Sequence, residues 1–432
     1  MRSLRVSWMP QDADAGHDPV VLGPDVLDRG VPPAAQGSFR LVGPPLRLRE
    51  YPAGTITNRN FARFDLAAWD RCYLSAPMAS LLDVPPLGDA EFVEDDNRSA
   101  IDPRPAATID GQPFFLSVKG VGSSVDPFAH APLDRSRAAE LTDDLGTRER
   151  LSTPAAEPGG LITGELWLRG SPYGGQGLPH ALTALRVSER ADVTDLNGFR
   201  IAPVVKVAFL PPELEQRLRT VYWYRRYRDR FVQELRLVPS NVRFYFHGRA
   251  TVGSDVAHVF DLFGVDSPGR AHRFQTNFVR SGIALLTLFA RTREYDPVRD
   301  LYRGLDFSDV WLDKDAVIAP DGTAYFVDLE GIDTVRVDAG DVAEKLDDQI
   351  FRSLYEFMFA YEQIDAERAR RFGESGGRRR RFEALLEEAL RDDRFVQLRS
   401  EGRSLMLGVR AAGGDERLNY TFPLVDHARG EL

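Results

Sequence analysis

The sequence predicts an α+β protein with a strand-rich first half and a helical second half. Three observations lead to this prediction. Before about residue 250, most recognisable patterns alternate apolar and polar residues, which is the period of strands. After it, apolar residues recur every three or four positions, which is the period of helices with one buried face. A single strand–turn–strand pattern at 316–328 interrupts those helices.

The N-terminal segment lacks a sustained period. Its first forty or so residues are rich in Pro, Gly and Asp, which is typical of an extended arm. We expect residues 1–110 to form an arm and extension packed on the sheet-rich part. The next part, 111–250, opens with a strand in which Phe114, Leu116 and Val118 alternate with Phe115, Ser117 and Lys119. Lys119 therefore ends a strand directly before a glycine-rich turn.

The middle of the chain combines further strands with two helices. Residues 126–160 are polar, with Pro and charge clusters, and are predicted to be a surface insertion with one short helix near 135–144. Apolar spacing predicts strands at 161–169, 199–210 and 235–246, and helices at 178–190 and 212–227.

Helices dominate the last part, 251–432. They are predicted at 273–293, 343–362 and 382–390. Between the first two of them, the 316–328 pattern contains Asp321-Gly322, a dipeptide that favours tight hairpin turns. We expect this hairpin to carry functional carboxylates to one place.

Composition limits the classes of function. A chain of 432 residues predicts two to three compact units at about 150 residues each. Its 55 Lys and Arg against 65 Asp and Glu leave a net charge of −10, so no nucleic-acid partner and no anionic membrane surface are expected. The single Cys72 excludes an intrachain disulfide, and the seven histidines lack zinc-ligand spacing. With no signal-peptide core or membrane-spanning apolar run, we expect a cytoplasmic protein.

Two aspartates mark one end of the predicted hairpin. Asp315 precedes its first strand and Asp328 follows its second, so the two carboxylates are expected to meet. Mg²⁺ prefers hard oxygen ligands and takes one or two protein carboxylates together with phosphates and water. The pair therefore indicates a magnesium site, although solvated acidic hairpin ends produce the same pattern.

Cationic residues suited to phosphate occur in two other places. Lys119 is followed by Gly120 and Gly122, which let a backbone approach phosphate oxygens. Arg236 and Arg243 flank a Pro-Ser turn, and the planar guanidinium matches phosphate geometry. The lysine, the arginine pair and the aspartate pair are each also typical of surface residues. The interpretation therefore depends on the order of these three groups along the chain.

That order resembles the protein-kinase-like two-lobed fold, with a nucleotide lysine on a strand of the N-lobe and a metal-binding aspartate after a hairpin in a helical C-lobe. More narrowly, the chain resembles a divergent relative of the selenoprotein O family of protein adenylyltransferases. Lys119-Gly120-Val121-Gly122 is similar to the family's Lys-Gly-Ala-Gly. The segment 236–244 is similar to its Arg-Val-Ala-Pro-Ser-His-Leu-Arg-Phe. The resemblance covers roughly 114–331.

The resemblance implies a sheet-rich N-lobe at 111–250 and a helical C-lobe at 251–432 that carries the metal-binding hairpin. It implies ATP and Mg²⁺ (or Mn²⁺) as cofactors, and transfer of AMP to a hydroxyl of a protein or small molecule. Cationic side chains would bind phosphate and aspartates the metal; these are Lys119, Arg236 and Arg243, and Asp315 and Asp328. The alternatives are a kinase that moves phosphate and a nucleotide-binding pseudokinase that acts through partners.

Two departures from the family bear on activity. Gly174 falls near the position of the glutamate that pairs with the lysine, so Glu165 or Gln176 substitutes for it or the pair is absent. Lys314 occupies the position of the proposed base, which leaves Asp313 or Asp309 to act from a shifted loop. The family's C-terminal redox cysteine or selenocysteine has no counterpart either, so redox control is not expected.

Overall fold

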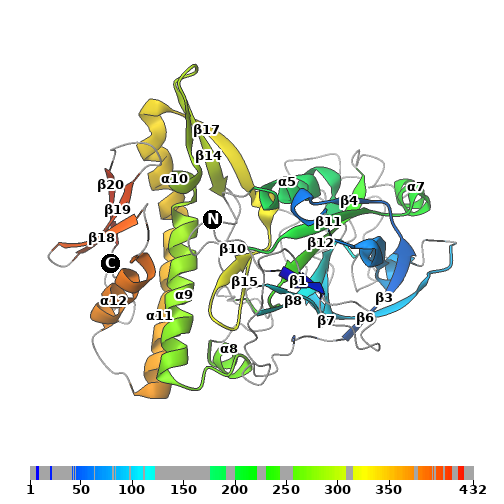
Figure 1. Cartoon of the computed structure of the whole chain (residues 1–432), viewed down its shortest axis with the longest axis horizontal. Coiled ribbons are helices and arrows are strands. Elements are labelled where there is room, and N and C mark those ends of the chain that lie inside the picture. Colours follow the sequence, from blue (N-terminus) through cyan, green and yellow to red (C-terminus); the bar gives the residue numbers. More distant parts are fainter. Residues whose placement is uncertain are drawn as a thin grey trace, which may run out of the picture.

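The computed structural model describes residues 6–8, 20–21, 41, 43, 45–62, 64–79, 82, 84–96, 99–109, 112–121, 176–190, 200–220, 230–243, 256–307, 315–373, 378–391, 393, 396–401, 404–410 and 417–422. The predicted α+β class is confirmed. Strands gather on one side of the molecule and two long helices stand on the other (Figure 1).

One antiparallel sheet builds the strand-rich side. Its path runs β4-β11-β12-β8-β7-β6-β3-β5, and β1, β2 and β9 pair alongside it. The strands are β1 (Val6–Trp8), β2 (Val20–Val21), β3 (Pro45–Pro52), β4 (Thr55–Thr57), β5 (Arg71–Leu74), β6 (Gly88–Asp96), β7 (Ser99–Ile109), β8 (Gln112–Lys119), β9 (Gln176–Gly177), β11 (Val204–Phe209) and β12 (Phe231–Val238).

This sheet curls back on itself. Only Ala53 and Gly54 separate β3 from β4, yet β3 pairs with β6 and β4 pairs with β11, at the other end of the path. The side chain of Gln233 on β12 also links β12 directly to β5, the last strand of the path. It accepts a hydrogen bond from the N–H of Tyr73 and donates one to the Tyr73 carbonyl. A buried apolar cluster that includes Leu48, Leu116 and Leu235 fills this part. Residues before and after position 110 therefore share one sheet.

Helix α5 (Leu178–Ser188) packs against the sheet (Figure 1). Its C-terminal end is fixed by the buried Asn58, whose Nδ2 donates to Ser188 Oγ at 2.9 Å and to the Val204 carbonyl at 2.7 Å. The other helical segments on this side are α1 (Ala76–Ala79), α7 (Pro212–Thr220) and the 3-10 turns η2 (Arg59–Phe61) and η3 (Ala67–Trp69).

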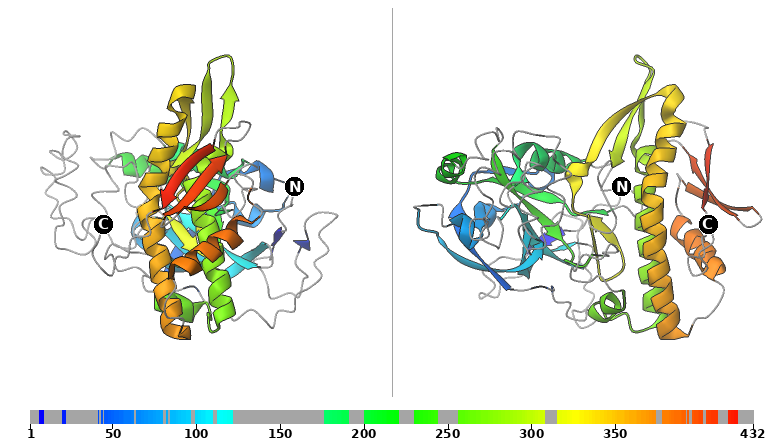
Figure 2. Two further views of the ribbon diagram at one scale, coloured as in Figure 1. Left: turned by 90° about the vertical axis from the view of Figure 1, so that its left-hand side faces the viewer. Right: turned by 180° about the vertical axis from the view of Figure 1, so that it is seen from behind.

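The helical side is built on α9 (Pro268–Leu286) and α11 (Val342–Phe372), which run side by side in the views of Figures 1 and 2. Ser267 caps α9, and Pro268 fits its first turn because that N–H needs no helical partner. The helices approach closely at Gly282, where a Cβ would lie 2.2 Å from the ring of Phe357. The remaining helices among the described residues of this side are α8 (Val256–Leu262), α10 (Leu288–Thr292) and α12 (Arg378–Leu390).

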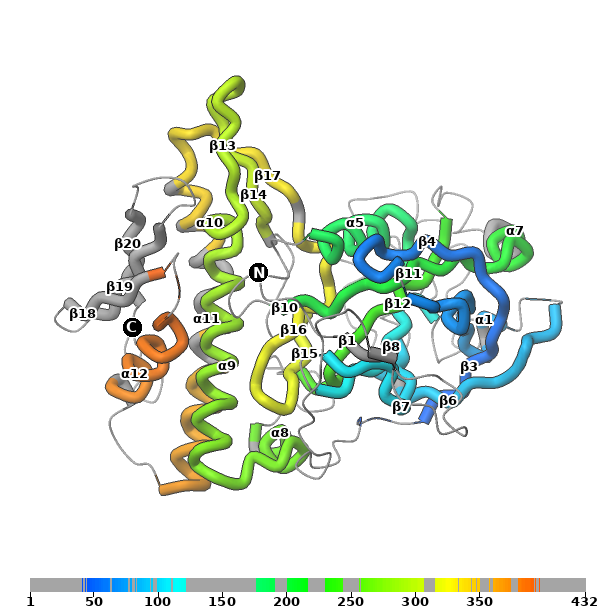
Figure 3. Tube along the Cα trace, in the orientation of Figure 1, coloured from blue at the N-terminus to red at the C-terminus, as the bar shows by residue number. Residues whose placement is uncertain are grey.

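Three small sheets complete the described structure. The hairpin β15 (Ala316–Ile318) and β16 (Ala324–Phe326) pairs in parallel with β10 (Arg200–Ile201), which joins the helical side to the strand-rich side (Figure 3). After it come η7 (Leu329–Gly331), β17 (Ile332–Asp338) and η8 (Ala339–Asp341). Strand β17 pairs with β14 (Leu301–Phe307), beside β13 (Glu294–Asp296). The third sheet is β18 (Val396–Glu401), β19 (Ser404–Arg410) and β20 (Arg417–Phe422).

Several predicted elements differ at their bounds. The strand expected over 235–246 lies at 231–238, because Pro239 lacks the N–H that would continue the ladder. The helix expected over 273–293 is two helices, which meet at Thr287. The expected helix at 135–144 and strand at 161–169 lie outside the described residues. Among the described helices, none is both long and apolar enough to cross a membrane.

Candidate functional site

Lys119 ends β8 with its side chain buried inside the protein. In the sheet it lies opposite Glu234 of β12 on one side and Ser99 of β7 on the other. Only 3% of the side chain is exposed. Gly120 follows with φ +98°, and a Cβ there would lie 2.9 Å from the Val232 carbonyl oxygen. A glycine is therefore required for the chain to turn directly after the lysine.

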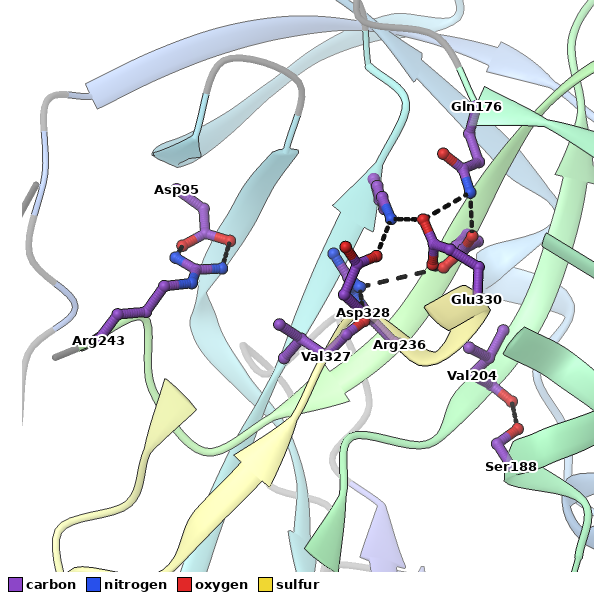
Figure 4. Close-up of polar contacts among 11 residues, drawn as sticks. Asp95, Gln176, Ser188, Val204, Arg236, Arg243, Val327, Asp328 and Glu330 are labelled. Atoms are coloured by element: carbon purple, nitrogen blue, oxygen red, sulfur yellow. Dashed lines mark hydrogen bonds and ion pairs between the residues drawn. The ribbon is translucent and has the colours of Figure 1, made fainter. Parts of the chain in front are cut away.

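The hairpin brings Asp328 to this lysine. Strands β15 and β16 pair antiparallel, and the N–H of Val327 donates to the Asp315 carbonyl at 2.8 Å, so the two aspartates share one end of the hairpin. Beyond it, Lys119 Nζ donates to Asp328 Oδ1 at 2.7 Å and also to Glu330 Oε1 (Figure 4). Residues 209 positions apart thus meet in one ion pair.

Further buried polar groups surround this contact. Gln176 Nε2, just before α5, donates to Glu234 Oε1 at 2.6 Å and to Glu330 Oε1 at 3.4 Å. Arg236 donates from Nη1 to the Val327 carbonyl and lies 4.0 Å from Glu234 Oε2. Glu234 and Arg236 are both buried. We call this group the lysine cluster: Lys119, Gln176, Glu234, Arg236, Asp328 and Glu330.

The lysine cluster has an excess of acidic groups. Three carboxyl groups face one ammonium and one guanidinium, which leaves a net charge of −1 if all are ionised. Burial and the neighbouring Asp328 raise the pKa of Glu330 to about 8, although Lys119 acts in the opposite direction. A proton on Glu330 at neutral pH therefore offsets the excess.

Arg243 lies apart from the lysine cluster. Its guanidinium forms a two-pronged ion pair with Asp95 of β6, in which Nη2 donates to Oδ2 at 2.9 Å (Figure 4). Both side chains are buried. Of the two arginines expected at phosphate, only Arg236 therefore contacts the hairpin end.

The other predicted site residues fall into two groups. Asp315 is buried at the hairpin end, and Gly120 forms the turn that follows Lys119. Gly122, Asp309 and Asp313 lie outside the described residues, as does Lys314. The described part of the chain contains no group of three or more His, Cys, Asp or Glu side chains that could hold a metal ion. A metal at Asp315 and Asp328 would therefore need ligands from a bound substrate as well.

Two residues of the lysine cluster were missed by sequence reasoning. Glu330 lies two residues after Asp328, and Glu234 lies two before Arg236 on the same face of β12. The usable signal was the pair Glu234 and Arg236 within a largely apolar segment. The structure buries every residue of β12, so this charged pair needs partners.

Comparison with known protein families, curated proteins and solved structures found no match to this chain. The α+β architecture and the lysine cluster are therefore the observations from which a function is inferred.

Proposed function

We propose that this chain is a kinase-like transferase that binds ATP with Mg²⁺ or Mn²⁺ at the lysine cluster and transfers AMP to a hydroxyl acceptor on a protein or small molecule. The contact between Lys119 and Asp328 carries the proposal. A phosphate-binding ammonium and a metal-binding carboxylate have to lie within one substrate's reach, and these two side chains touch.

The order of elements supports the same proposal. A lysine-bearing strand, the arginine segment that begins in β12, the long helix α9, the hairpin and Asp328 follow one another as in the two-lobed kinase-like fold. Strand β10 pairs in parallel with β16 and so attaches the hairpin to the strand-rich side. Lys119 comes from the strand-rich side, and Asp328 comes from the hairpin attached to it.

The donors present fit a triphosphate and a hard metal ion. Asp328, 28% exposed, is open to a cation from solvent, and Asp315 lies at the same hairpin end. Bound Mg²⁺ supplies charge neutralisation for the phosphates. Arg236 Nε is buried and makes no hydrogen bond within the described part of the chain, which leaves one guanidinium donor for an anionic group. For such a transfer the protein contributes mainly positioning and charge compensation.

A second candidate is a nucleotide-binding protein that transfers nothing. It is favoured because carboxylates already hold cations expected at phosphate: Asp328 and Glu330 hold Lys119, and Asp95 holds Arg243. A ligand would have to displace at least one of these pairs before it could bind.

The test is incubation with a divalent metal and ATP labelled at either the α- or the γ-phosphate, with a protein lysate as the source of acceptors. Asp328→Asn is the test variant. Asp296→Asn is the matched control, because Asp296 is 23% exposed and pairs with Arg303 away from the lysine cluster. We expect label from the α position, lost in Asp328→Asn and kept in Asp296→Asn.

The other outcomes separate the alternatives. Label from the γ position alone would identify a kinase. No transfer, with a nucleotide-dependent rise in melting temperature, would identify the non-catalytic nucleotide binder. No transfer and no change in melting temperature would contradict the nucleotide site.

A further inference from the structure

Strands β14 and β17 form an arm that begins beside the lysine cluster. Strand β17 starts two residues after Glu330, at Ile332, which pairs with Phe307 of β14. The ladder then continues for six steps to the pair of Leu301 and Asp338, which is about 20 Å at about 3.4 Å a residue. Its far end, where a turn joins β13 to β14, projects past the N-terminal end of α11 (Figures 1 and 2).

Two large apolar side chains are exposed at the end of this arm. Val298 is 91% exposed and Tyr295 is 50% exposed. The other large apolar side chains that are exposed in the described part of the chain are Val84 and Leu87, which lie on the strand-rich side. Exposed apolar surface that is gathered in one place indicates contact with a partner. We call residues 294–300 the arm tip.

The arm tip is held in one conformation that leaves Val298 in solvent. Asp296 Oδ1 accepts from the N–H of Val298 at 3.1 Å and from the N–H of Arg299 at 3.3 Å. The Tyr295 hydroxyl donates to Asp300 Oδ1 at 2.7 Å. Because these contacts already order the turn, a partner that binds Val298 loses little affinity to the ordering of this loop.

The charges in and beside the arm tip exclude an anionic partner. Three acidic residues and two basic ones give 2 − 3 = −1; they are Glu294, Asp296 and Asp300, and Arg299 and Arg303. Both arginines pair with Asp296. An acidic tip on a chain of net charge −10 does not suit a nucleic acid or an anionic membrane. It suits a protein pocket that is apolar inside and basic at its rim.

We infer that the arm tip docks the hydroxyl acceptor and that this acceptor is a folded protein, an inference that rests on the proposed function. A small molecule at the lysine cluster cannot also reach Val298, about 20 Å further along the ladder. A domain of about 100 residues, with a radius of gyration of about 13 Å, spans that distance. In the transfer, the acceptor oxygen bonds to the α-phosphorus of ATP, pyrophosphate leaves and the hydroxyl proton passes to solvent.

The test divides a lysate by ultrafiltration into macromolecules and small molecules. Each fraction is incubated with Mg²⁺, ATP labelled at the α-phosphate, and wild type, Val298→Asp or Leu87→Asp. Leu87→Asp is the matched control, because Leu87 is 57% exposed and lies just before β6, away from the arm. Since both side chains are exposed, both variants should fold and bind ATP like the wild type, as circular dichroism and calorimetry check.

We expect label in the macromolecular fraction. At a low concentration of that fraction, Val298→Asp should label about tenfold more slowly than wild type, and Leu87→Asp should label at the wild-type rate. A higher concentration of the fraction should restore the rate of Val298→Asp, because lost docking raises KM and leaves kcat unchanged.

Two further variants separate loss of apolar surface from added charge. Val298→Ser removes the apolar surface without a charge and should also raise KM, and it replaces Val298→Asp if that variant fails to fold. Val298→Ile keeps the surface and should label like the wild type. A rate that stays low at every concentration of the fraction, or an equal loss in Leu87→Asp, would overturn the inference.

Failure of this inference is distinguishable from failure of the proposed function. If Val298→Asp and Val298→Ser label macromolecules as fast as the wild type, docking at the arm tip is wrong and the transferase stands. Label in the small-molecule fraction alone would likewise contradict only the protein acceptor. If the wild type labels neither fraction, the proposed function is wrong and the inference falls with it.

Discussion

Replacing Glu330 by Gln should change how the stability of the protein depends on pH. Burial and Asp328 raise the pKa of Glu330 from 4.5 to about 8 in the folded state. In the unfolded chain the same carboxyl loses its proton near its ordinary value. Between these two values the folded state binds more protons than the unfolded state. The free energy of unfolding therefore falls as pH rises through this window.

The size of the effect follows from the two pKa values. At about 1.36 kcal/mol for each pKa unit, the difference between 4.5 and about 8 corresponds to about 5 kcal/mol as an upper bound. Because the side chain is 13% exposed, contact with water reduces this upper bound. We therefore expect the free energy of unfolding to fall by about 2–4 kcal/mol. The loss is absent below pH 4.5 and complete above about pH 8.

Urea denaturation of wild type and Glu330→Gln between pH 5 and pH 9 measures this effect. The variant lacks the titrating carboxyl, so the difference between the two proteins isolates Glu330 from the other groups that titrate. We expect the variant to gain stability relative to wild type as pH rises. A difference that stays constant with pH, or one that favours wild type at high pH, would refute the reasoning.

Two further predictions concern the framework around the site. Asp95→Asn should cost about 3–5 kcal/mol of unfolding free energy in urea denaturation, because it leaves the buried Arg243 guanidinium without its carboxylate; a cost below about 1 kcal/mol would mean that water reaches the arginine. Gly322→Ala should lower the melting temperature, with a cost of about 2–3 kcal/mol, because Gly322 has φ +90° and its added Cβ would lie 2.1 Å from the Phe274 carbonyl oxygen. An unchanged melting temperature would show that the turn adapts freely.

Local chemistry made part of the fold predictable. The hairpin at 316–328 is confirmed because the Asp321-Gly322 turn fixes its position: the Asp321 side chain accepts from the Thr323 N–H, and Gly322 supplies the positive φ. The long helices are confirmed because their apolar spacing is sustained. The extent of the large sheet was not predictable, because β7 contains Pro103 and Pro105 and its pairing register shifts at Pro105.

The candidate site was predictable only as separate pieces. Lys119 ends β8 and Asp328 follows β16 closely, and both strands have a recognisable pattern, so both residues were identified. Glu330 was missed because the sequence of a buried turn resembles that of an exposed one. The burial of Glu330 depends on the packing of α5 over the turn η7. Asp95, which pairs with Arg243, was also missed. Asp95 lies in a segment expected to be an extension, and only the pairing of distant strands brings the two side chains together.

The most direct test of the nucleotide site is calorimetric titration of ATP with Mg²⁺ into wild type, Lys119→Met and Asp328→Asn. Each variant is first shown to be folded by circular dichroism. The proposed site predicts binding to the wild type that needs the metal, and weak or absent binding to both variants. Equal ATP affinity in all three proteins, or no binding to the wild type, would contradict it.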